Sequence, residues 1–334
     1  MSPATPGGIV LAADVGGTKT RLALVPALGR GRIGSPGAER TYLSADFPSL
    51  EAMIDAFRSS HDGPIAAVSI GFAGPVAEGR GVGTHVPWVA DERALARHLG
   101  LPRAHVINDL VASGYGVPAL GPEDFETLLP GAPGEPANVA IVSAGTGLGE
   151  TTLLRHQGDL IPVASEGGHA DFAPRTDLEI EVFRALRAEF GRVSMERVLS
   201  GLGLGNVARV LHAMDGAAAV FERHRDESGP DDLPAAVSGN ALAGTCPSCV
   251  RSLELFVSVY GAEAGNAALR GLALSGVYLG GGIAPQILPA LRGPIFRDAF
   301  LDKEPHRELL GRVPVHVIRT DRSALLGAAR YATL

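Results

Sequence analysis

Lysine is almost absent from this chain, cysteine is scarce, and no apolar stretch is long. Lys19 and Lys303 are the two lysines, and 29 basic residues against 36 acidic ones leave a net charge of -7. Without a broad cationic surface, the chain gives no support to nucleic-acid binding. No run of roughly 18 apolar residues predicts a membrane span. The N-terminal MSPATPGG lacks a basic segment ahead of an apolar one, so we expect a cytoplasmic protein.

The two cysteines, Cys246 and Cys249, form a C-x-x-C. This spacing occurs in zinc sites and in redox pairs. A zinc site would need two more ligands, and the sequence has no second C-x-x-C. The segment also has the pattern of a helix start, with Pro247 in the first turn. We therefore expect reduced structural thiols, with an adventitious disulfide and a metal site as the alternatives.

The composition is that of a globular protein, and the length suggests two lobes. Hydrophobic residues make up 46% of the chain and charged residues 19%, which excludes a disordered protein. Because 334 residues exceed the usual size of one domain, we expect two lobes with a cleft between them. In the first lobe, short β-rich runs predict strands at 9–15, 21–25, 65–76 and 104–110, and a helical pattern covers 91–100. This alternation predicts an α/β fold.

The second lobe is expected to begin in a stretch rich in Pro and Gly, 117–138, which we interpret as a surface connection. Residues 138–165 then repeat the strand, glycine turn and strand of the N-terminus. The later patterns predict helices at 176–190, 194–214 and 246–273, a strand at GVYLGG, a helix from about 284, a strand at VPVHVIR and a closing helix from Asp321.

A carboxylate and a glycine turn follow the first strand. Asp14 ends the strand, and Gly16, Gly17 and Thr18 form the turn. Glycines let backbone N–H groups approach a phosphate closely, and the carboxylate could hold Mg²⁺, usually through water. An ordinary hairpin turn is the alternative interpretation.

A second turn of small residues contains Gly145, Thr146 and Gly147. Two such turns, each between two strands, suggest a phosphate chain held from both sides. The dinucleotide-binding fingerprint is excluded because it needs a helix directly after the glycines, whereas LGETTLL continues as a strand. The G-x-x-x-x-G-K-[ST] phosphate loop is absent as well.

Two further segments place polar groups where a strand or a turn ends. Asp109 follows Asn108 at the end of a strand, where an Asp is usually a helix cap but can also accept the proton of an attacking hydroxyl. Glu166 and His169 are separated by two glycines, and Glu196 begins ERVLSG. Glu166 and His169 could be a metal pair, but a metal site needs further imidazoles or thiolates nearby, and His156 alone is an unconvincing partner. The alternative is a site that hydrogen-bonds the hydroxyls of a sugar.

A third glycine-rich segment follows the strand GVYL. Gly281 and Gly282 precede Ile283 and leave a flat surface on which a purine ring can rest. The alternative is the start of a helix, with Pro285 in its first turn.

Taken together and in this order, the segments resemble the bacterial glucokinase family of the hexokinase, or actin-like ATPase, superfamily. The resemblance spans nearly the whole chain. EGGHADFAPR and ERVLSGLGL are its specific segments, because glycine turns recur in many sugar and acid kinases. The other segments that carry it are DVGGTKTRLAL, INDLVASGYGVPAL, SAGTGLGE, the CPSC region before a long helix, and YLGGGIAP.

The resemblance implies the two-lobed α/β fold of the actin-like ATPases, which is ribonuclease H-like, with an interlobe cleft. A small domain would comprise residues 1–116 and 320–334, and a large domain would comprise 117–319. The implied activity is the ATP-dependent phosphorylation of glucose to glucose 6-phosphate at the start of glycolysis. Mg²⁺ as a cofactor and a homodimer are implied in the same way.

The family's roles can be transferred residue by residue. Asp109 would be the catalytic base, and the other sugar ligands would be Asn108, Glu166, His169 and Glu196. Asp14 would position Mg²⁺ through water. The nucleotide would be held at its phosphates by Gly16, Gly17, Thr18, Gly145, Thr146 and Gly147, and at its adenine by Gly281, Gly282 and Ile283.

Two positions depart from the family's pattern. His85 in THVPW (84–88) stands where Asn is common, and Lys19 follows GGT where Asn is usual. The alternatives are therefore a kinase for another hexose or an amino sugar, and a non-catalytic sugar-sensing protein on the same fold. A repressor would carry an N-terminal helix-turn-helix, for which Asp14 comes too early. The zinc-binding ROK sugar kinases share the glycine turns, but their G-x-C cysteine cluster is absent.

Overall fold

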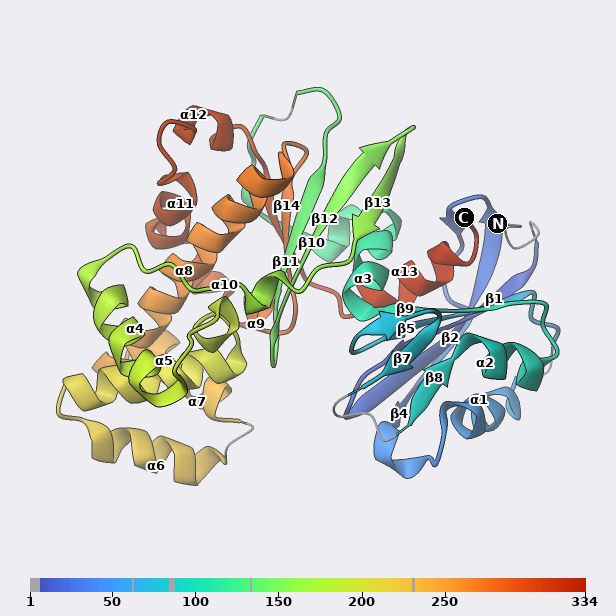
Figure 1. The fold of residues 1–334 in the computed structure, drawn as a ribbon, viewed down its shortest axis with the longest axis horizontal. Coiled ribbons are helices and arrows are strands. Elements are labelled where there is room, and N and C mark those ends of the chain that lie inside the picture. Colours follow the sequence, from blue (N-terminus) through green and yellow to red (C-terminus); the bar gives the residue numbers. More distant parts are fainter. Residues whose placement is uncertain (1–6, 62, 84–87, 133, 230–231) are drawn as a thin grey trace. The chain divides into compact units, whose positions relative to one another are not determined.

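The chain forms two compact units, each built from a β-sheet and helices (Figure 1). The computed structural model describes residues 7–61, 63–83, 88–132, 134–229 and 232–334. Unit 1 is Met1–Pro122, Asp159–Ala164 and Thr320–Leu334, and unit 2 is Glu123–Gly158 and Ser165–Arg319.

Unit 1 is organised around one mixed sheet. Its strands run in the order β3-β2-β1-β5-β9, and β4 also pairs with β2. Because β1, β5 and β9 are parallel, their carboxyl ends lie at the same edge, where Asp14 is opposite Gly71 and Phe72 is opposite Asn108. The strands are β1 (Ile9–Val15), β2 (Lys19–Gly29), β3 (Arg32–Ile33), β4 (Ala38–Leu43), β5 (Ala67–Phe72) and β9 (Ala104–Asn108).

Helices cover both faces of this sheet because β1 sends successive side chains to opposite sides. Leu11 packs with α1 and α2, whereas Val10 packs with α3 and α13. The helices are α1 (Leu50–Arg58), α2 (Glu92–Leu99), α3 (Asp109–Gly116) and α13 (Ser323–Tyr331). Smaller elements are η1 (Ser44–Asp46), η2 (Val117–Ala119), the three-stranded sheet of β6 (Val76–Ala77), β7 (Arg80–Val82) and β8 (Val89–Asp91), and β13 (Asp159–Val163), which contacts α3.

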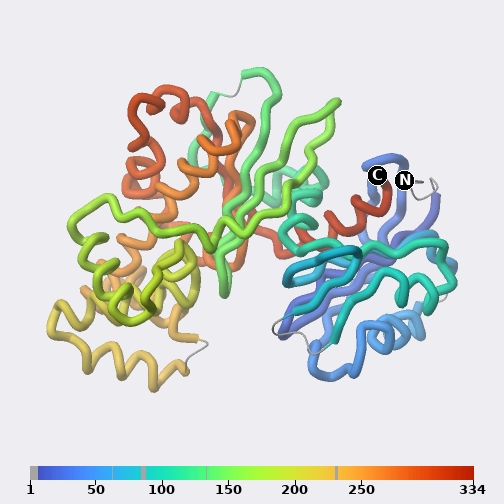
Figure 2. Tube along the Cα trace, viewed as in Figure 1, coloured from blue at the N-terminus to red at the C-terminus, as the bar shows by residue number. Residues whose placement is uncertain are grey.

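Glycines let α3 and α13 approach each other closely, and the tube in Figure 2 follows the two helices side by side. A Cβ atom added at Gly327 would lie 1.7 Å from the carbonyl oxygen of Ala112, and one added at Gly116 would lie 1.9 Å from that of Ser323. Any side chain at either glycine would therefore separate the helices.

Unit 2 has a sheet in which β10, β15, β14, β11 and β12 follow one another. The strands are β10 (Phe125–Leu129), β11 (Val139–Ala144), β12 (Leu148–His156), β14 (Val277–Gly280) and β15 (Val315–Ile318). The long helix α8 (Pro247–Gly271) packs against β11, where the buried Tyr260 hydroxyl donates to the carbonyls of Val142 and Gly280 at 3.2 and 3.3 Å. Tyr260 thus hydrogen-bonds both β11 and β14, which are neighbours in the sheet.

Helices make up most of the rest of unit 2. They are α4 (Asp177–Phe190), α5 (Gly201–Met214), α6 (Ala218–Ser228), α7 (Leu233–Leu242), α8 (Pro247–Gly271), α9 (Ile283–Gln286), α10 (Leu288–Leu291), α11 (Pro294–Leu301) and α12 (Arg307–Leu310), with short 3-10 turns η3 (Pro122–Asp124), η4 (Gly167–His169) and η5 (Met195–Arg197). Helices α5, α7, α10 and α11 pack against α8. Within the described residues, no helix is both long and apolar enough to cross a lipid bilayer.

Three sequence expectations need correction. The stretch 117–138 is not only a connection, because it contains β10. The helix expected over 194–214 begins at Gly201, since Ser200 caps it by accepting from the Gly203 N–H at 2.9 Å. The strand expected over 104–110 ends at Asn108, and α3 begins at the next residue, Asp109.

Candidate active site

The turn after β1 is held by a hydroxyl from another segment. The N–H of Gly16 donates to the Lys19 carbonyl at 3.0 Å, and the Ser44 hydroxyl donates to the Gly16 carbonyl at 2.7 Å. A Cβ atom at Gly16 would lie 2.9 Å from the Lys19 oxygen, so this position requires glycine. The structure places Gly17 and Thr18 at the tip of the same turn.

Asp14 occupies an electrostatically unfavourable position for a carboxylate. Burial raises its pKa to about 7, and the negative charge of Asp109 adds to this rise. Asp14 and Asp109 are therefore close enough to repel each other, and a divalent cation beside them would relieve the repulsion. Carboxylate oxygens are the ligands that Mg²⁺ prefers, so these residues fit that ion.

An ion pair beside Asp14 was not expected from the sequence. Arg21 lies opposite Asp14 in the β1–β2 register. Its guanidinium donates from Nη1 to Oδ1 of Asp321 at 2.7 Å and from Nη2 to Oδ2. This hydrogen bonding lowers the pKa of Asp321. No local pattern could have revealed the pair, because 300 residues separate its members.

Asn108, and not Asp109, caps helix α3. The Asn108 Oδ1 accepts from the N–H groups of Leu110 and Val111 at 3.0 and 3.2 Å. The Asn108 Nδ2 donates to the Gly74 carbonyl at 3.1 Å and to the Asp109 Oδ1 at 3.0 Å. The Asp109 Oδ1 also accepts from the Leu110 N–H at 2.9 Å, so the half-buried carboxylate is oriented both by Asn108 and by the first turn of α3.

In unit 2, the structure brings Glu166, His169 and Glu196 together. The His169 Nε2 lies 3.9 Å from an oxygen of Glu166, and its Nδ1 lies 3.8 Å from an oxygen of Glu196. The side chains of Glu166 and His169 are 74% and 57% exposed, against 26% for Glu196. Two carboxylates and an imidazole thus remain accessible to the hydroxyls of a ligand.

Glu196 also contacts the second glycine turn. Its Oε2 accepts from the Leu148 N–H at 3.0 Å. A Cβ atom at Gly147 would lie 2.6 Å from that oxygen, and one at Gly168 would lie 2.0 Å from the Leu148 carbonyl oxygen. The absence of side chains at both glycines therefore allows the predicted sugar-binding and phosphate-binding segments to pack directly on each other.

The predicted adenine segment lies beside the same turn. Gly281 has a φ of +81°, and a Cβ atom there would lie 2.1 Å from the Ala144 carbonyl oxygen. The Gly145 carbonyl accepts from the N–H of Gly201, the first residue of α5, at 2.8 Å. Thr146 and Gly282 are exposed near these contacts, and Ile283 begins α9.

A buried acidic pair behind the sugar-binding segment was also missed by the sequence analysis. Arg270 donates to Oε2 of Glu150 at 2.8 Å and also to Glu263. Burial raises the pKa of Glu150 to about 8, and the charge of Glu263 contributes to this rise. A Cβ atom at Gly167 would lie 2.6 Å from the same Glu150 oxygen, so the pair supports the segment that carries Glu166 and His169.

The predicted residues thus form one group in each unit. Unit 1 contains the group of Asp14, Gly16, Gly17, Thr18, Asn108 and Asp109, and unit 2 contains the group of Gly145, Thr146, Gly147, Glu166, His169, Glu196, Gly281, Gly282 and Ile283. His85 lies outside the described residues.

Comparisons with known proteins show which proteins this chain is similar to. A glucokinase of Synechocystis sp. is 40% identical, and the alignment covers 96% of each chain. The crystal structure of a glucokinase from an Antarctic psychrotroph has a TM-score of 0.85 at 31% identity and covers 97% of this chain and 98% of its own. A ROK family glucokinase from Streptomyces griseus, in complex with glucose and AMPPNP, has a TM-score of 0.62 at 25% identity and covers 97% and 99%.

These likenesses confirm the α/β fold of the actin-like kinases that the sequence predicted. A family model described as Glucokinase matches residues 11–334. With nearly the whole chain inside that match, the protein belongs to the glucokinase family.

Proposed function

We propose that this protein transfers the γ-phosphoryl group of ATP to the 6-hydroxyl of D-glucose, with Asp109 as the general base. The observation that carries the role of Asp109 is the orientation of its carboxylate, whose Oδ1 accepts from the Asn108 side-chain amide at 3.0 Å and from the Leu110 N–H at 2.9 Å. Family membership supports the reaction, and the complex of the Streptomyces griseus relative with glucose and AMPPNP supports the ligands.

On the sugar side, Glu166, His169 and Glu196 bind the hydroxyls that do not react. Carboxylates accept hydrogen bonds from hydroxyls, and an imidazole can accept at one nitrogen and donate at the other. A site that pairs each hydroxyl rejects analogues that lack one, because its own polar groups would lose their partners. The three side chains thus orient the 6-hydroxyl, whose proton Asp109 accepts as the oxygen attacks phosphorus.

On the nucleotide side, the two glycine turns bind the phosphates through backbone N–H groups, and Gly281, Gly282 and Ile283 border the adenine. Mg²⁺, when bound, neutralises the charge that develops on the transferred group. Asp14 would hold this ion, through water. Arg21 is paired with Asp321, and its positive charge favours the ionised form of the neighbouring Asp14.

The proposal extends to the setting of the reaction. The formation of glucose 6-phosphate would be the first step of glycolysis. As the family resemblance implies, the protein would be a homodimer in the cytoplasm. The proposed small domain, residues 1–116 and 320–334, corresponds to unit 1 without 117–122 and 159–164, and the proposed large domain is 117–319. A kinase for another hexose or amino sugar, or a sugar-sensing protein, is the competing function.

A coupled assay of ADP release over a panel of hexoses, amino sugars and phosphoryl donors tests the proposal. We expect glucose with ATP to give the highest kcat/KM. A higher kcat/KM for mannose or glucosamine would make that sugar, and not glucose, the preferred substrate. Absence of sugar-dependent ADP release would overturn the proposed function.

A further inference from the structure

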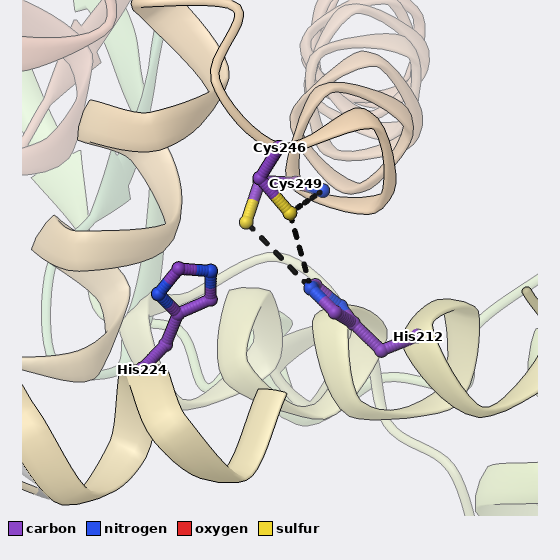
Figure 3. A group of neighbouring side chains, drawn as sticks. All are labelled: His212, His224, Cys246 and Cys249. Carbon is purple, nitrogen blue, oxygen red and sulfur yellow. Dashed lines mark hydrogen bonds between the residues drawn. The ribbon is translucent and has the colours of Figure 1, made fainter. Parts of the chain in front are cut away.

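Four potential metal ligands meet in unit 2, apart from the residues assigned to sugar and nucleotide. His212 comes from α5, His224 from α6, Cys246 directly precedes α8, and Cys249 lies in its first turn. One ligand atom from each residue lies within 4.8 Å of the other three. Figure 3 shows the two sulfur atoms and the two imidazole rings directed toward one another.

The separations around His212 are those of a tetrahedral zinc site. Its Nε2 lies 3.4 Å from the sulfur of Cys246 and 3.8 Å from that of Cys249. Zn–S bonds of about 2.3 Å and Zn–N bonds of about 2.0 Å in a tetrahedron separate nitrogen from sulfur by roughly 3.5 Å. An ion can therefore be placed at bonding distance from these three atoms with little movement.

The protonation of His212 also suits a ligand. Its Nδ1 lies 2.7 Å from the carbonyl oxygen of Ala208, and because a carbonyl can only accept, Nδ1 carries the proton. The lone pair is then on Nε2, the atom that faces the sulfurs. A hydrogen bond from the other ring nitrogen to a backbone carbonyl is a common way to orient a metal-binding histidine.

His224 supplies an independent sign of a missing partner. Its Nε2 is buried, and no hydrogen-bond partner for it exists among the residues that the structure describes. A buried polar atom without a partner costs free energy, so such atoms are rare in native proteins. The ring of His224 lies 6.1 Å from that of His212, centroid to centroid, at 82°. A metal ion in the cluster would give this nitrogen its partner.

The sulfur of Cys246 has the surroundings of a bound thiolate. It accepts the N–H of Cys249 at 3.4 Å at the start of α8, where the helix dipole stabilises negative charge. Cys246 and Cys249 are both buried and not joined in a disulfide. The sequence analysis lacked two ligands for zinc at the C-x-x-C, and the fold supplies them from two other helices.

We propose that His212, His224, Cys246 and Cys249 bind one structural Zn²⁺ ion. Two thiolates and two imidazoles form a closed tetrahedral set with no open position for substrate, which is the form of a structural site. Binding releases the two thiol protons to solvent, and both histidines bind as neutral imidazoles.

The ion would join α5, α6 and the start of α8. Helix α5 begins at Gly201, whose N–H donates to the carbonyl of Gly145 in the predicted phosphate-binding turn. Ser200, the cap of α5, also donates from its hydroxyl to the Glu196 carbonyl at 2.8 Å. Zinc would thus stabilise α5, the helix that supports the Gly145 turn and the segment with Glu196. Loss of zinc should therefore lower the melting temperature of the protein and change kcat little.

The test measures metal directly in the full chain. The protein is purified without an affinity tag, exchanged into metal-free buffer, and analysed by inductively coupled plasma mass spectrometry. We expect about one zinc ion per chain, as a closed four-ligand site binds zinc tightly. A cobalt-substituted sample should show the thiolate-to-metal charge-transfer band and the strong visible bands of tetrahedral Co²⁺.

Variants separate the cluster from incidental zinc. His224→Ala and Cys246→Ser should each lower the bound zinc at least about tenfold, because a tetrahedral site with three ligands is weakened. His156 is exposed and outside the cluster, so His156→Gln is the matched control, and this variant should retain the zinc ion. Apo-protein prepared with a chelator should melt at a lower temperature, and added Zn²⁺ should restore it.

Two results would overturn the proposal. The first is wild-type protein that is folded and active, carries no zinc after purification or reconstitution, and has two titratable thiols or a disulfide by alkylation and mass spectrometry. The second is zinc that remains in both ligand variants. The wild-type measurement decides the question even if a variant fails to fold.

Discussion

The side-chain amide of Asn108 donates a 3.0 Å hydrogen bond to the Oδ1 of Asp109 while its oxygen caps the helix that Asp109 begins. One side chain therefore starts the helix and orients the proposed base. The sequence analysis assigned Asn108 to the sugar. In the structure its amide hydrogens bind Gly74 and Asp109, so it acts as a positioning residue, and its contact with the sugar stays a prediction.

Replacing Asp109 by Ala should lower kcat at least about 100-fold, because general-base catalysis contributes about 10²- to 10⁴-fold. Glucose should still bind, since the three residues assigned to its other hydroxyls are in unit 2. Steady-state kinetics and calorimetry measure the two quantities. Asp55→Ala, at an exposed position, is the control. Near-full turnover of the Asp109 variant would show that Asp109 is not the catalytic base.

Asn108→Asp should separate capping from orientation. An Asp caps a helix about as well as Asn, so the free energy of unfolding should change by less than about 1 kcal/mol. The new carboxylate lies beside Asp109 and repels it, which raises the pKa of Asp109 and moves the acidic limb of the kcat profile to higher pH. An unchanged pH profile with a raised KM for glucose would instead support the sugar contact.

Glu166→Gln should raise the KM for glucose by at least about tenfold, as expected when a hydrogen bond between a charged group and a hydroxyl is weakened. The KM for ATP should change little. Glu181→Gln, on the exposed side of α4, is the matched control. An unaltered KM for glucose would place Glu166 outside the sugar site.

Gly147→Ala should affect both substrates. Its Cβ atom would meet the Oε2 of Glu196 at 2.6 Å and displace that carboxylate, so the KM for glucose should rise together with the KM for ATP. At Gly145, in the same turn, an added Cβ atom has nothing within 4 Å. Gly145→Ala should therefore leave the KM for glucose unchanged, and equal effects of the two substitutions on that KM would contradict the coupling.

The buried Glu150 predicts a pH dependence of stability. Its pKa is raised from 4.5 to about 8 in the folded protein, so the folded state binds the proton more tightly than the unfolded state. The free energy of unfolding should then be largest below about pH 4.5 and fall as the pH rises to about 8, as far as this group contributes. Urea titrations between about pH 5 and pH 9 measure this slope.

Glu150→Gln keeps a side-chain oxygen for Arg270 and removes the ionisation. The variant should lose less stability than the wild type between about pH 5 and pH 8. If the two proteins show the same slope, Glu150 ionises normally in the fold.

Features formed by residues close together in the sequence could be predicted, whereas features formed by residues far apart in the sequence could not. The glycine turns and strand ends are local, so Asp14, Asn108 and Gly147 were found from short patterns. Residues brought together from distant segments were not found, as with Arg21 and Asp321 or with the histidines beside the C-x-x-C. Helix α5 begins later than expected because a serine cap outweighs the apolar periodicity before it.

The close packing of α3 on α13 has a consequence during synthesis. Residues 323–331 leave the ribosome after all of unit 2, whereas β1, β5 and β9 are made early. A nascent chain thus holds the strands of unit 1 with one face of their sheet lacking its second helix. Gly116 and Gly327 join α3 to its late-made partner, so the setting of Asp109 is completed only after unit 2 has been translated.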